Sequence, residues 1–329
     1  MKAMMTQNRF RLFPRWLNSF ALLVLLLLAF SPLRADLRNP TAEMLWYNAR
    51  APYPGILETS FEIIEPRLMA FWLVRVDLSN PAIHLVTNKR AEGWGEPMPD
   101  HSLLKIRTKR QTVGAFMSSC RSNVEEGGRG LNVVLAVNAS PWVPWQKPYD
   151  HKYADNMGCM VSEGELVCPA NGRWCFCVPK EGKPFLRKIE PLDDVSELWL
   201  SLPGFDRILA NGEITVEDAP ADLHPRTAFG LSANARFLYI LVVDGRQKGY
   251  SEGACCFELA QLLKLAGASD ALYMDGGMDG GEFTTLVLWD ARKKAPRMLN
   301  THGKGKEKGG TDSKYQRPVA NALGVYLAY

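Results

Sequence analysis

The sequence lacks the motifs by which several common enzyme classes are recognised. It contains no Walker A loop and no His-Glu-x-x-His, so it shows no sign of a phosphate-binding P-loop or a zinc-protease helix. Histidine is also scarce, with five in 329 residues. His84 lies in an apolar run and is interpreted as a core residue. Only His151, beside Asp150, keeps open a catalytic or ligand role.

Little net charge remains once the first segment is set aside. Residues 1–35 hold five of the 39 Lys and Arg residues and no acidic residue, which leaves 34 basic and 35 acidic residues in the remainder. A near-neutral chain has no general signature of nucleic-acid binding, and we expect no nucleic-acid partner. The hydrophobic share of 47% and the charged share of 22% are those of an ordinary globular protein.

The first 35 residues are expected to be a secretory signal rather than part of the fold. Basic residues precede the apolar run Phe20 to Phe30, which is too short to span a bilayer comfortably, and Ala35 suits a cleavage site. An uncleaved anchor is the alternative, and it would be the only contact with a membrane. We therefore expect an exported protein, periplasmic or extracellular, with an N-terminal arm at 36–65 and a single domain at 66–329.

Seven cysteines in an exported protein can form disulfides. A two-residue turn at Glu163-Gly164 would place Cys159 opposite Cys168, close enough for a bridge. Cys175 and Cys177 are further candidates. A zinc site built from these four cysteines is the alternative, although no Cys-x₂-Cys spacing is present.

Two predicted strands run directly into an acidic residue. Phe237–Val243 ends at Asp244, and Ala271–Met274 ends at Asp275. Between them, apolar residues at helical spacing predict a helix that is capped by Ser251 and stops at Gly267. A right-handed crossover would make the two strands parallel, so that both aspartates open onto one crevice if the strands are neighbours. The predicted fold class is α/β, or mixed α+β: one domain with a central mixed sheet flanked by helices.

The predicted crevice collects carboxylates, arginines and glycines. Two carboxylates can divide acid and base roles when their environments separate their pKa values. They can instead hold Ca²⁺ or Mg²⁺, with Asp244, Asp275 and Asp279 as candidate ligands. Arg226 and Arg246 lie near strand ends and suit a phosphate, and glycine-rich backbone adds N–H donors for an anion.

A further buried strand, Leu131–Asn138, ends in an asparagine and is followed by a loop that contains Trp142. This arrangement resembles the wall of a sugar site, while an Asx turn with surface tryptophans stays open as the alternative. Residues 291–317 are rich in lysine and glycine, and we interpret them as a solvated loop rather than an anion-binding flap.

In their order and spacing, several of these blocks resemble the phosphodiester glycosidase family. The resemblance extends from about residue 65 to residue 329. The matching blocks are the strand ending in Asn138, His224–Gly230, Val243–Arg246 with the helix after it, Ala271–Gly277, and Arg317–Gly324.

The resemblance implies the fold of that family and hydrolysis of a glycosyl phosphodiester, or of a related glycosidic bond in a surface or secreted glycan. It implies that Asp275 and Asp244 are catalytic or bind a metal, and that a carbohydrate or sugar phosphate is the ligand. A non-catalytic glycan-binding envelope protein on the same scaffold is the alternative, because Asp-Gly-Gly is doubled here and Ala139-Ser140 replaces a Gly-Gly pair. The implied ligand-binding residues are Asn138, Arg226, Arg246, Gly276 and Gly277, with Asp279 and Trp142 beside them.

Overall fold

The computed structural model describes residues 42–65, 67–145, 151–276, 284–301 and 316–328. The predicted signal segment lies outside these residues. Strands dominate the described chain, and none of its helices is long and apolar enough to cross a membrane. The described helices are α2 (Ala42–Tyr47), α3 (Val113–Arg121) and α4 (Cys256–Ala266), with a short 3₁₀ turn η1 (Val124–Glu126).

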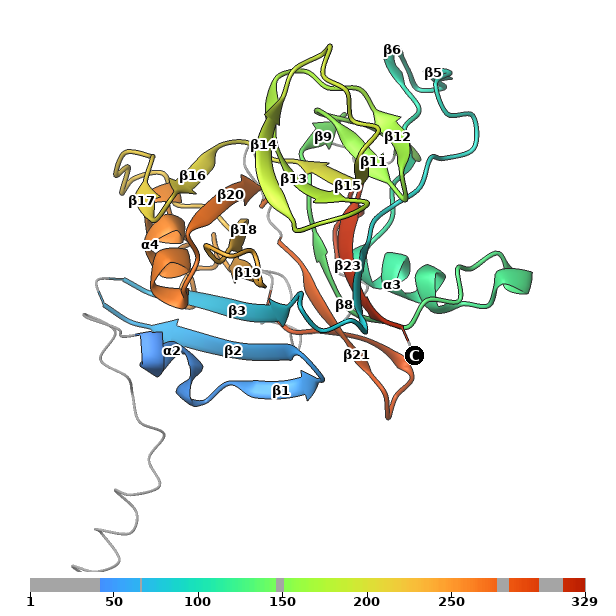
Figure 1. Ribbon diagram of the computed structural model, residues 1–329. Coiled ribbons are helices and arrows are strands. Elements are labelled where there is room, and N and C mark those ends of the chain that lie inside the picture. The colour runs from blue at the N-terminus through green and yellow to red at the C-terminus, as the bar shows by residue number, and fades with distance from the viewer. Residues whose placement is uncertain (1–41, 66, 146–150, 277–283, 302–315, 329) are drawn as a thin grey trace, which may run out of the picture. The chain divides into compact units, whose positions relative to one another are not determined.

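The strands form two principal sheets and a smaller lobe (Figure 1). In spatial order, the eight-stranded sheet contains β1 (Arg50–Tyr53), β2 (Ile56–Ile63), β3 (Met69–Asp77), β19 (Phe237–Val243), β18 (Arg226–Leu231), β20 (Asp270–Met274), β16 (Arg207–Ala210) and β17 (Glu213–Ile214). The facing five-stranded sheet contains β22 (Ala295–Met298), β21 (Leu286–Asp290), β8 (Val133–Asn138), β23 (Ala322–Leu327) and β4 (Ile83–Val86).

A second five-stranded sheet and two small ribbons complete the described strands. This second sheet contains β12 (Glu165–Cys168), β11 (Met160–Ser162), β15 (Leu198–Pro203), β13 (Arg173–Pro179) and β14 (Phe185–Ile189). The ribbons are β7 (Thr108–Lys109), β10 (Tyr153–Asn156) and β9 (Trp142–Val143), and the pair β5 (Pro97–Met98) and β6 (His101–Lys105).

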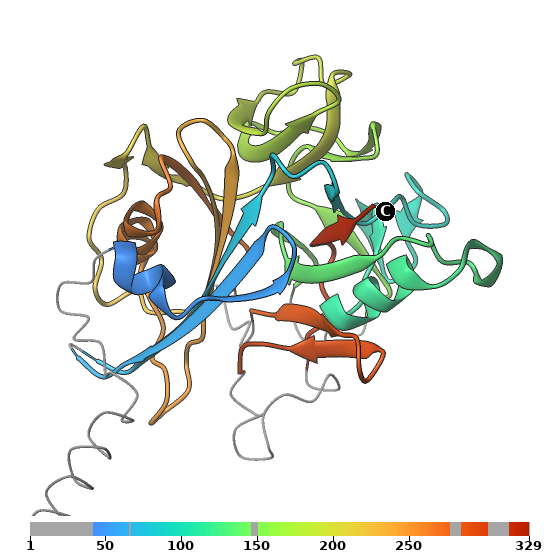
Figure 2. The same ribbon diagram turned by 60° about the horizontal axis from the view of Figure 1, so that its bottom comes forward.

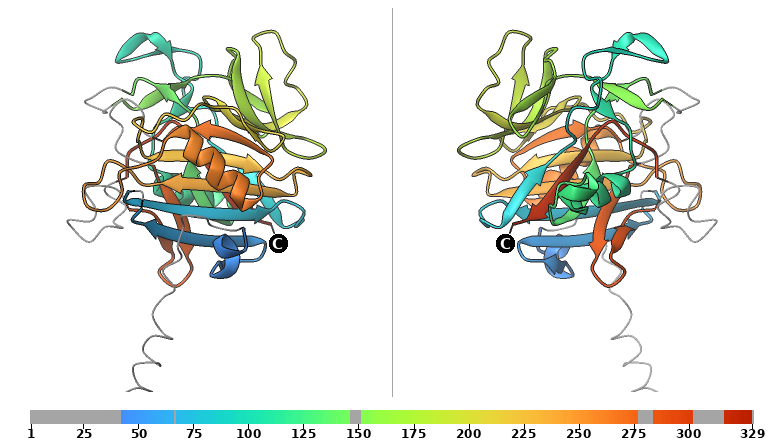
Figure 3. Two further views of the ribbon diagram at one scale, coloured as in Figure 1. Left: turned by 90° about the vertical axis from the view of Figure 1, so that its left-hand side faces the viewer. Right: turned by 90° about the vertical axis from the view of Figure 1, so that its right-hand side faces the viewer.

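The two principal sheets stack face to face. One core joins Phe229 and Ile240 of the eight-stranded sheet to Leu135 and Val325 of the facing sheet. On the outer face of the eight-stranded sheet, α4 packs through residues such as Leu263, and α3 covers the outer face of the other sheet (Figures 2 and 3). Because alternate residues of a strand point to opposite faces, each sheet can contribute to two cores at once.

The predicted α/β class is corrected to a mostly β fold. Every strand pairing within the described residues is antiparallel, so the prediction of a mixed sheet is wrong. The predicted strands before Asp244 and Asp275 exist, but β18 lies between them and is antiparallel to both. The helix between them begins at Cys256 rather than after Ser251, because Glu258 accepts a hydrogen bond from the Cys255 amide (3.0 Å) and completes a capping box.

The predicted bridge between Cys159 and Cys168 is absent. Glu163 and Gly164 do form the turn, with φ of 52° and 80°. A bulge next to Met160 then shifts the register, so that Cys168 pairs with Met160 and not with Cys159. All seven cysteines are free thiols.

Candidate functional site

A line of polar side chains crosses from one principal sheet to the other where several strands end. Val243 pairs with Arg226, and Met274 pairs with Thr227, so the ends of β19 and β20 flank the start of β18. With one strand between them, the backbones of β19 and β20 are about 10 Å apart. We call this line the polar seam, and its members are Asp244, Asn300, Thr227, Thr284, Asn138, Asp275 and Arg317.

Asp244 forms one end of the polar seam and is 1% exposed. Its two carboxylate oxygens accept hydrogen bonds from Asn300 Nδ2 (2.8 Å) and from the Thr301 amide (2.9 Å). Ser251 Oγ donates to the Asp244 carbonyl (2.6 Å), which fixes the backbone at the end of β19. Burial raises the pKa of Asp244 to about 7, although the bonds from Asn300, Thr301 and Tyr250 act in the opposite direction.

Asn138 and two threonines form the middle of the polar seam. Asn138 Oδ1 accepts from the Thr285 amide (2.7 Å) and from Thr284 Oγ1 (3.1 Å), and its Nδ2 donates to the Asp275 carbonyl. The Thr227 and Thr284 hydroxyls also bond to each other. The amide expected to contact a sugar hydroxyl is therefore engaged within the protein, where it joins the two sheets.

Asp275 forms the other end and is 8% exposed. Its carboxylate accepts from Arg317 Nη2 at 2.8 Å, and its backbone amide donates to the Ala139 carbonyl at 2.8 Å. Gly276 follows because the chain passes directly over β18: a Cβ there would lie 2.5 Å from the Arg226 Cα. No other residue fits this approach without moving the backbone.

Trp142 lies beside this end and is buried under two arginines. The guanidinium carbons of Arg110 and Arg317 are 4.6 and 5.6 Å from its ring centre. Ser140 Oγ and Arg317 Nε are buried without a hydrogen-bond partner among the described residues. Buried donors without acceptors, beside two guanidinium groups, favour an anion at this end of the polar seam.

Arg226 does not face the polar seam. Residues alternate along β18, so Thr227 points to the facing sheet while Arg226 points to the side of α4. Arg226 is fully buried there, donating to the Ala254 carbonyl (3.0 Å) and to Asp222 Oδ2 (2.6 Å), and its guanidinium lies over the Tyr273 ring (4.8 Å). In the described structure, Arg226 holds the segments of Asp222 and Ala254 against β18.

Arg246 is exposed and has a φ of 57°. Its Nη2 donates to His224 Nδ1 at 2.6 Å, and His224 Nε2 lies 2.7 Å from Asp222 Oδ1. Arginine cannot accept a hydrogen bond, so the Nδ1 of His224 must be unprotonated and the ring neutral. Burial and the charges of Arg226 and Arg246 lower the pKa of His224, in agreement with this geometry.

The remaining expectations concern Gly277 and Asp279, a metal site and His151. Gly277 and Asp279 lie outside the described residues. No group of three His, Cys, Asp or Glu side chains in the described ranges is placed to hold a metal, and the groups around Asp244 and Asp275 are donors rather than ligands. His151 pairs with Asp100 at 2.5 Å.

Sequence reasoning missed Arg317, Asn300 and the two threonines. Arg317 was assigned to a lysine-rich loop, although it stands just before the last core strand, where a charged residue is brought to a sheet edge. The threonines carry no signal that separates them from ordinary strand residues. Alternation along β18, however, predicts that only one of Arg226 and Thr227 can face the polar seam.

The fold and the polar seam define a two-sheet β protein with a carboxylate-based site at one edge. The chain belongs to the phosphodiester glycosidase family, whose model matches residues 132–326, more than half of its length. No curated protein sequence matches the chain.

Solved structures share the fold at low sequence identity. The catalytic domain of zebrafish N-acetylglucosamine-1-phosphodiester alpha-N-acetylglucosaminidase, auto-inhibited by its pro-peptide, has a TM-score of 0.57 at 15% identity, covering 85% of this chain and 86% of its own. A hypothetical protein from Synechocystis gives 0.53 at 13%, covering 85% and 63%. A protein from Burkholderia pseudomallei that is described as exported gives 0.50 at 13%, covering 79% and 74%. At these identities the likeness shows the fold alone.

Proposed function

We propose that the protein is an exported hydrolase that cleaves a glycosyl phosphodiester, or a related glycosidic bond, in a surface or secreted glycan. Family membership supports the reaction class. The observation that carries the proposal is the pair of buried carboxylates in unlike surroundings, with uncharged donors at Asp244 and a guanidinium at Asp275. Unlike surroundings are what separate an acid from a base in hydrolases that use two carboxyl groups.

Asp244 is the proton donor in this proposal. A carboxyl group whose pKa is raised to about 7 by burial stays largely protonated at slightly acidic pH and can donate to a departing oxygen. Asp275, held by the Arg317 guanidinium, either activates water or attacks the sugar carbon. The bond between the sugar carbon and the phosphate oxygen breaks, the phosphate oxygen takes the proton, and water supplies hydroxide to the sugar carbon.

The Asp275 end is assigned to an anionic group of the glycan other than the departing phosphate, because the phosphate oxygen that takes the proton must lie within reach of Asp244. Arg317 and Arg110 lie on Trp142, and Ser140 Oγ and Arg317 Nε are buried donors without acceptors among the described residues. Arg226, which sequence reasoning placed on the phosphate, is engaged on the other face of its sheet. Arg246 is exposed beside Asp244 and can still meet the substrate from solvent.

A release assay on sugar-1-phosphodiesters tests the proposal, with Asp275→Asn and Asp270→Asn as paired variants. Both aspartates belong to β20 or follow it directly, and both pair with an arginine, but Asp270 lies at the opposite end of the strand with Arg207. We expect turnover by the wild type and by Asp270→Asn, and loss of turnover in Asp275→Asn. Sugar binding without turnover by the wild type would instead indicate a non-catalytic glycan-binding protein. Undiminished turnover by Asp275→Asn would refute its assignment.

A further inference from the structure

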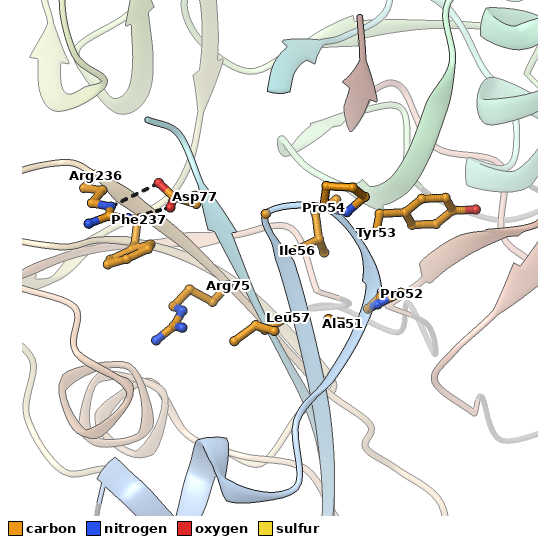
Figure 4. Close-up of a pocket in the computed structure, with 11 residues that line it drawn as sticks. Ala51, Pro52, Tyr53, Pro54, Ile56, Leu57, Arg75, Asp77, Arg236 and Phe237 are labelled. Carbon is orange, nitrogen blue, oxygen red and sulfur yellow. Dashed lines mark hydrogen bonds and ion pairs between the residues drawn. The ribbon is translucent and has the colours of Figure 1, made fainter. Parts of the chain in front are cut away.

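A groove of about 550 Å³ opens at the far end of β19 from the polar seam. It is lined by the β1–β2 hairpin, by Arg75 and Asp77 of β3, and by Phe237 (Figure 4). Phe237 begins β19 and Asp244 follows its last residue, so the groove and the polar seam are seven residue steps apart, about 23 Å along an extended strand. The groove is therefore outside the site described above.

Arg75 is the half-buried cation of this groove. Its guanidinium carbon lies 5.0 Å from the ring centre of Trp46 and 4.8 Å from that of Phe237. Within the described ranges, no carboxylate pairs with it. Figure 4 shows its side chain between Phe237 and Leu57, with its charged end away from the Asp77 pair. Stacking fixes the plane of the guanidinium and leaves its N–H edges for a ligand.

The other cation of the groove is neutralised. Arg236 donates to both oxygens of Asp77, Nε to Oδ1 at 3.2 Å and Nη2 to Oδ2 at 2.8 Å. Hydrogen bonds from Arg236 hold the pKa of Asp77 well below its ordinary value, so this pair is charged and self-compensated. The groove consequently has one uncompensated positive charge, which is that of Arg75.

The remaining walls are mostly apolar. Phe237 lies against the guanidinium, and Tyr53, Pro52 and Pro54 add apolar surface along the β1–β2 hairpin. Such surface suits the C–H faces of a sugar ring, while a guanidinium suits a carboxylate or phosphate in the two-bond geometry that arginine favours. We propose that this groove binds an acidic saccharide, one whose ring carries a carboxylate or a phosphate, through Arg75.

This site does not depend on the proposed hydrolysis. A glycan with repeated acidic units could occupy the groove while another part of it reaches the polar seam, but the groove holds its ligand whether or not the chain is an enzyme. Binding measurements alone can therefore test it, and an inactive protein would leave the test intact.

The experiment measures binding of glucuronate, glucose 6-phosphate and glucose to the full chain by calorimetry or ligand-observed NMR. We expect the two acidic sugars to bind at least tenfold more tightly than glucose. Arg75→Gln should weaken acidic-sugar binding about tenfold or more, because a charge-assisted pair is lost. Arg50→Gln is the matched control: Arg50 is on β1 at the same sheet edge, pairs with Glu58 and does not line the groove.

A second variant tests the charge balance in the opposite direction. Asp77→Asn releases Arg236 into the groove, so acidic sugars should bind several-fold more tightly, and this result does not depend on Arg75→Gln folding. Equal binding of glucose and the acidic sugars would overturn the proposal. So would unchanged binding in Arg75→Gln, weaker binding in Asp77→Asn, or inorganic phosphate that binds as tightly as glucose 6-phosphate.

Discussion

The two ends of the polar seam each hold one buried carboxylate, but they hold it by different means. Asp244 accepts hydrogen bonds from the Asn300 side chain and the Thr301 amide, neither of which carries a charge. Asp275 faces the guanidinium of Arg317 at 2.8 Å. Uncharged donors compensate the loss of water only in part, whereas a cation supplies an opposite charge at contact distance.

This difference teaches that position at a sheet edge does not fix the partners of a buried acid. Both aspartates follow a buried strand of the same sheet, and by sequence they are equivalent. Their partners come from different strands of the facing sheet: Asn300 lies after β22 and Arg317 lies before β23. The facing sheet, and not the strand that carries the aspartate, therefore sets the electrostatic surroundings of each carboxylate.

The largest effect is expected from Asp275→Asn. It leaves the buried Arg317 cation without a counter-charge, so we expect the free energy of unfolding to fall by about 3 kcal/mol and turnover to fall about 10³-fold. Urea denaturation and the release assay measure the two effects. Asp270→Asn is the control, and its more exposed pair should cost at most about 1 kcal/mol. An equal fall in the free energy of unfolding for both variants would mean that the buried Asp275–Arg317 pair stabilises the fold no more than the Asp270–Arg207 pair does.

Asp244→Asn should also lose turnover, but its effect on stability should depend on pH. The folded-state pKa of Asp244, about 7, lies above the ordinary value of 3.8, so its contribution to stability is greatest below pH 3.8 and is lost as pH rises through 7. The loss across that window is up to about 4 kcal/mol.

The neutral amide in Asp244→Asn removes this pH dependence. Because both Asp244 oxygens accept hydrogen bonds and an amide has one acceptor oxygen, the variant loses one of these bonds at every pH. The free energy of unfolding should therefore fall more between pH 4 and pH 8 in the wild type than in Asp244→Asn. Thermal melts across this range provide the measurement. An equal fall in the two proteins would show that the carboxylate is ionised and well compensated.

Sequence supplied the parts of this site that are local and missed the parts that depend on pairing. A buried strand that ends in aspartate is visible as an apolar run before Asp244, and the helix of α4 is visible in its apolar spacing. The insertion of β18 between β19 and β20 leaves no local trace, because strand order is decided by contacts distant in sequence. The bulge next to Met160 also leaves no signal in the sequence. It shifts the strand register, so that Cys159 and Cys168 are not opposite each other. Arg317 could be placed only once the facing sheet was known.

Thr227→Val tests the middle of the polar seam and should have a moderate effect. It removes the hydroxyl that bonds to Thr284 Oγ1, while Thr284 keeps its bond to Asn138. We expect a loss of about 1 to 2 kcal/mol in the free energy of unfolding, with both carboxylate ends affected alike. Thr215→Val, at an exposed threonine, should cost under about 0.5 kcal/mol. A larger loss for the exposed site would remove the distinction between the polar seam and the surface.

The smallest effect concerns Arg246, which approaches the Asp244 end from solvent. Its contact with His224 Nδ1 needs a neutral ring, and the lowered pKa of His224 means that this contact is present at neutral pH and lost as pH falls through that pKa. We expect KM to rise several-fold in the wild type toward pH 5. His224→Gln can accept from Arg246 and donate to Asp222 without titrating, so its KM should stay flat while the fall in kcat above pH 7 from Asp244 is unchanged. An equal rise of KM toward pH 5 in the wild type and in His224→Gln would show that His224 does not position Arg246.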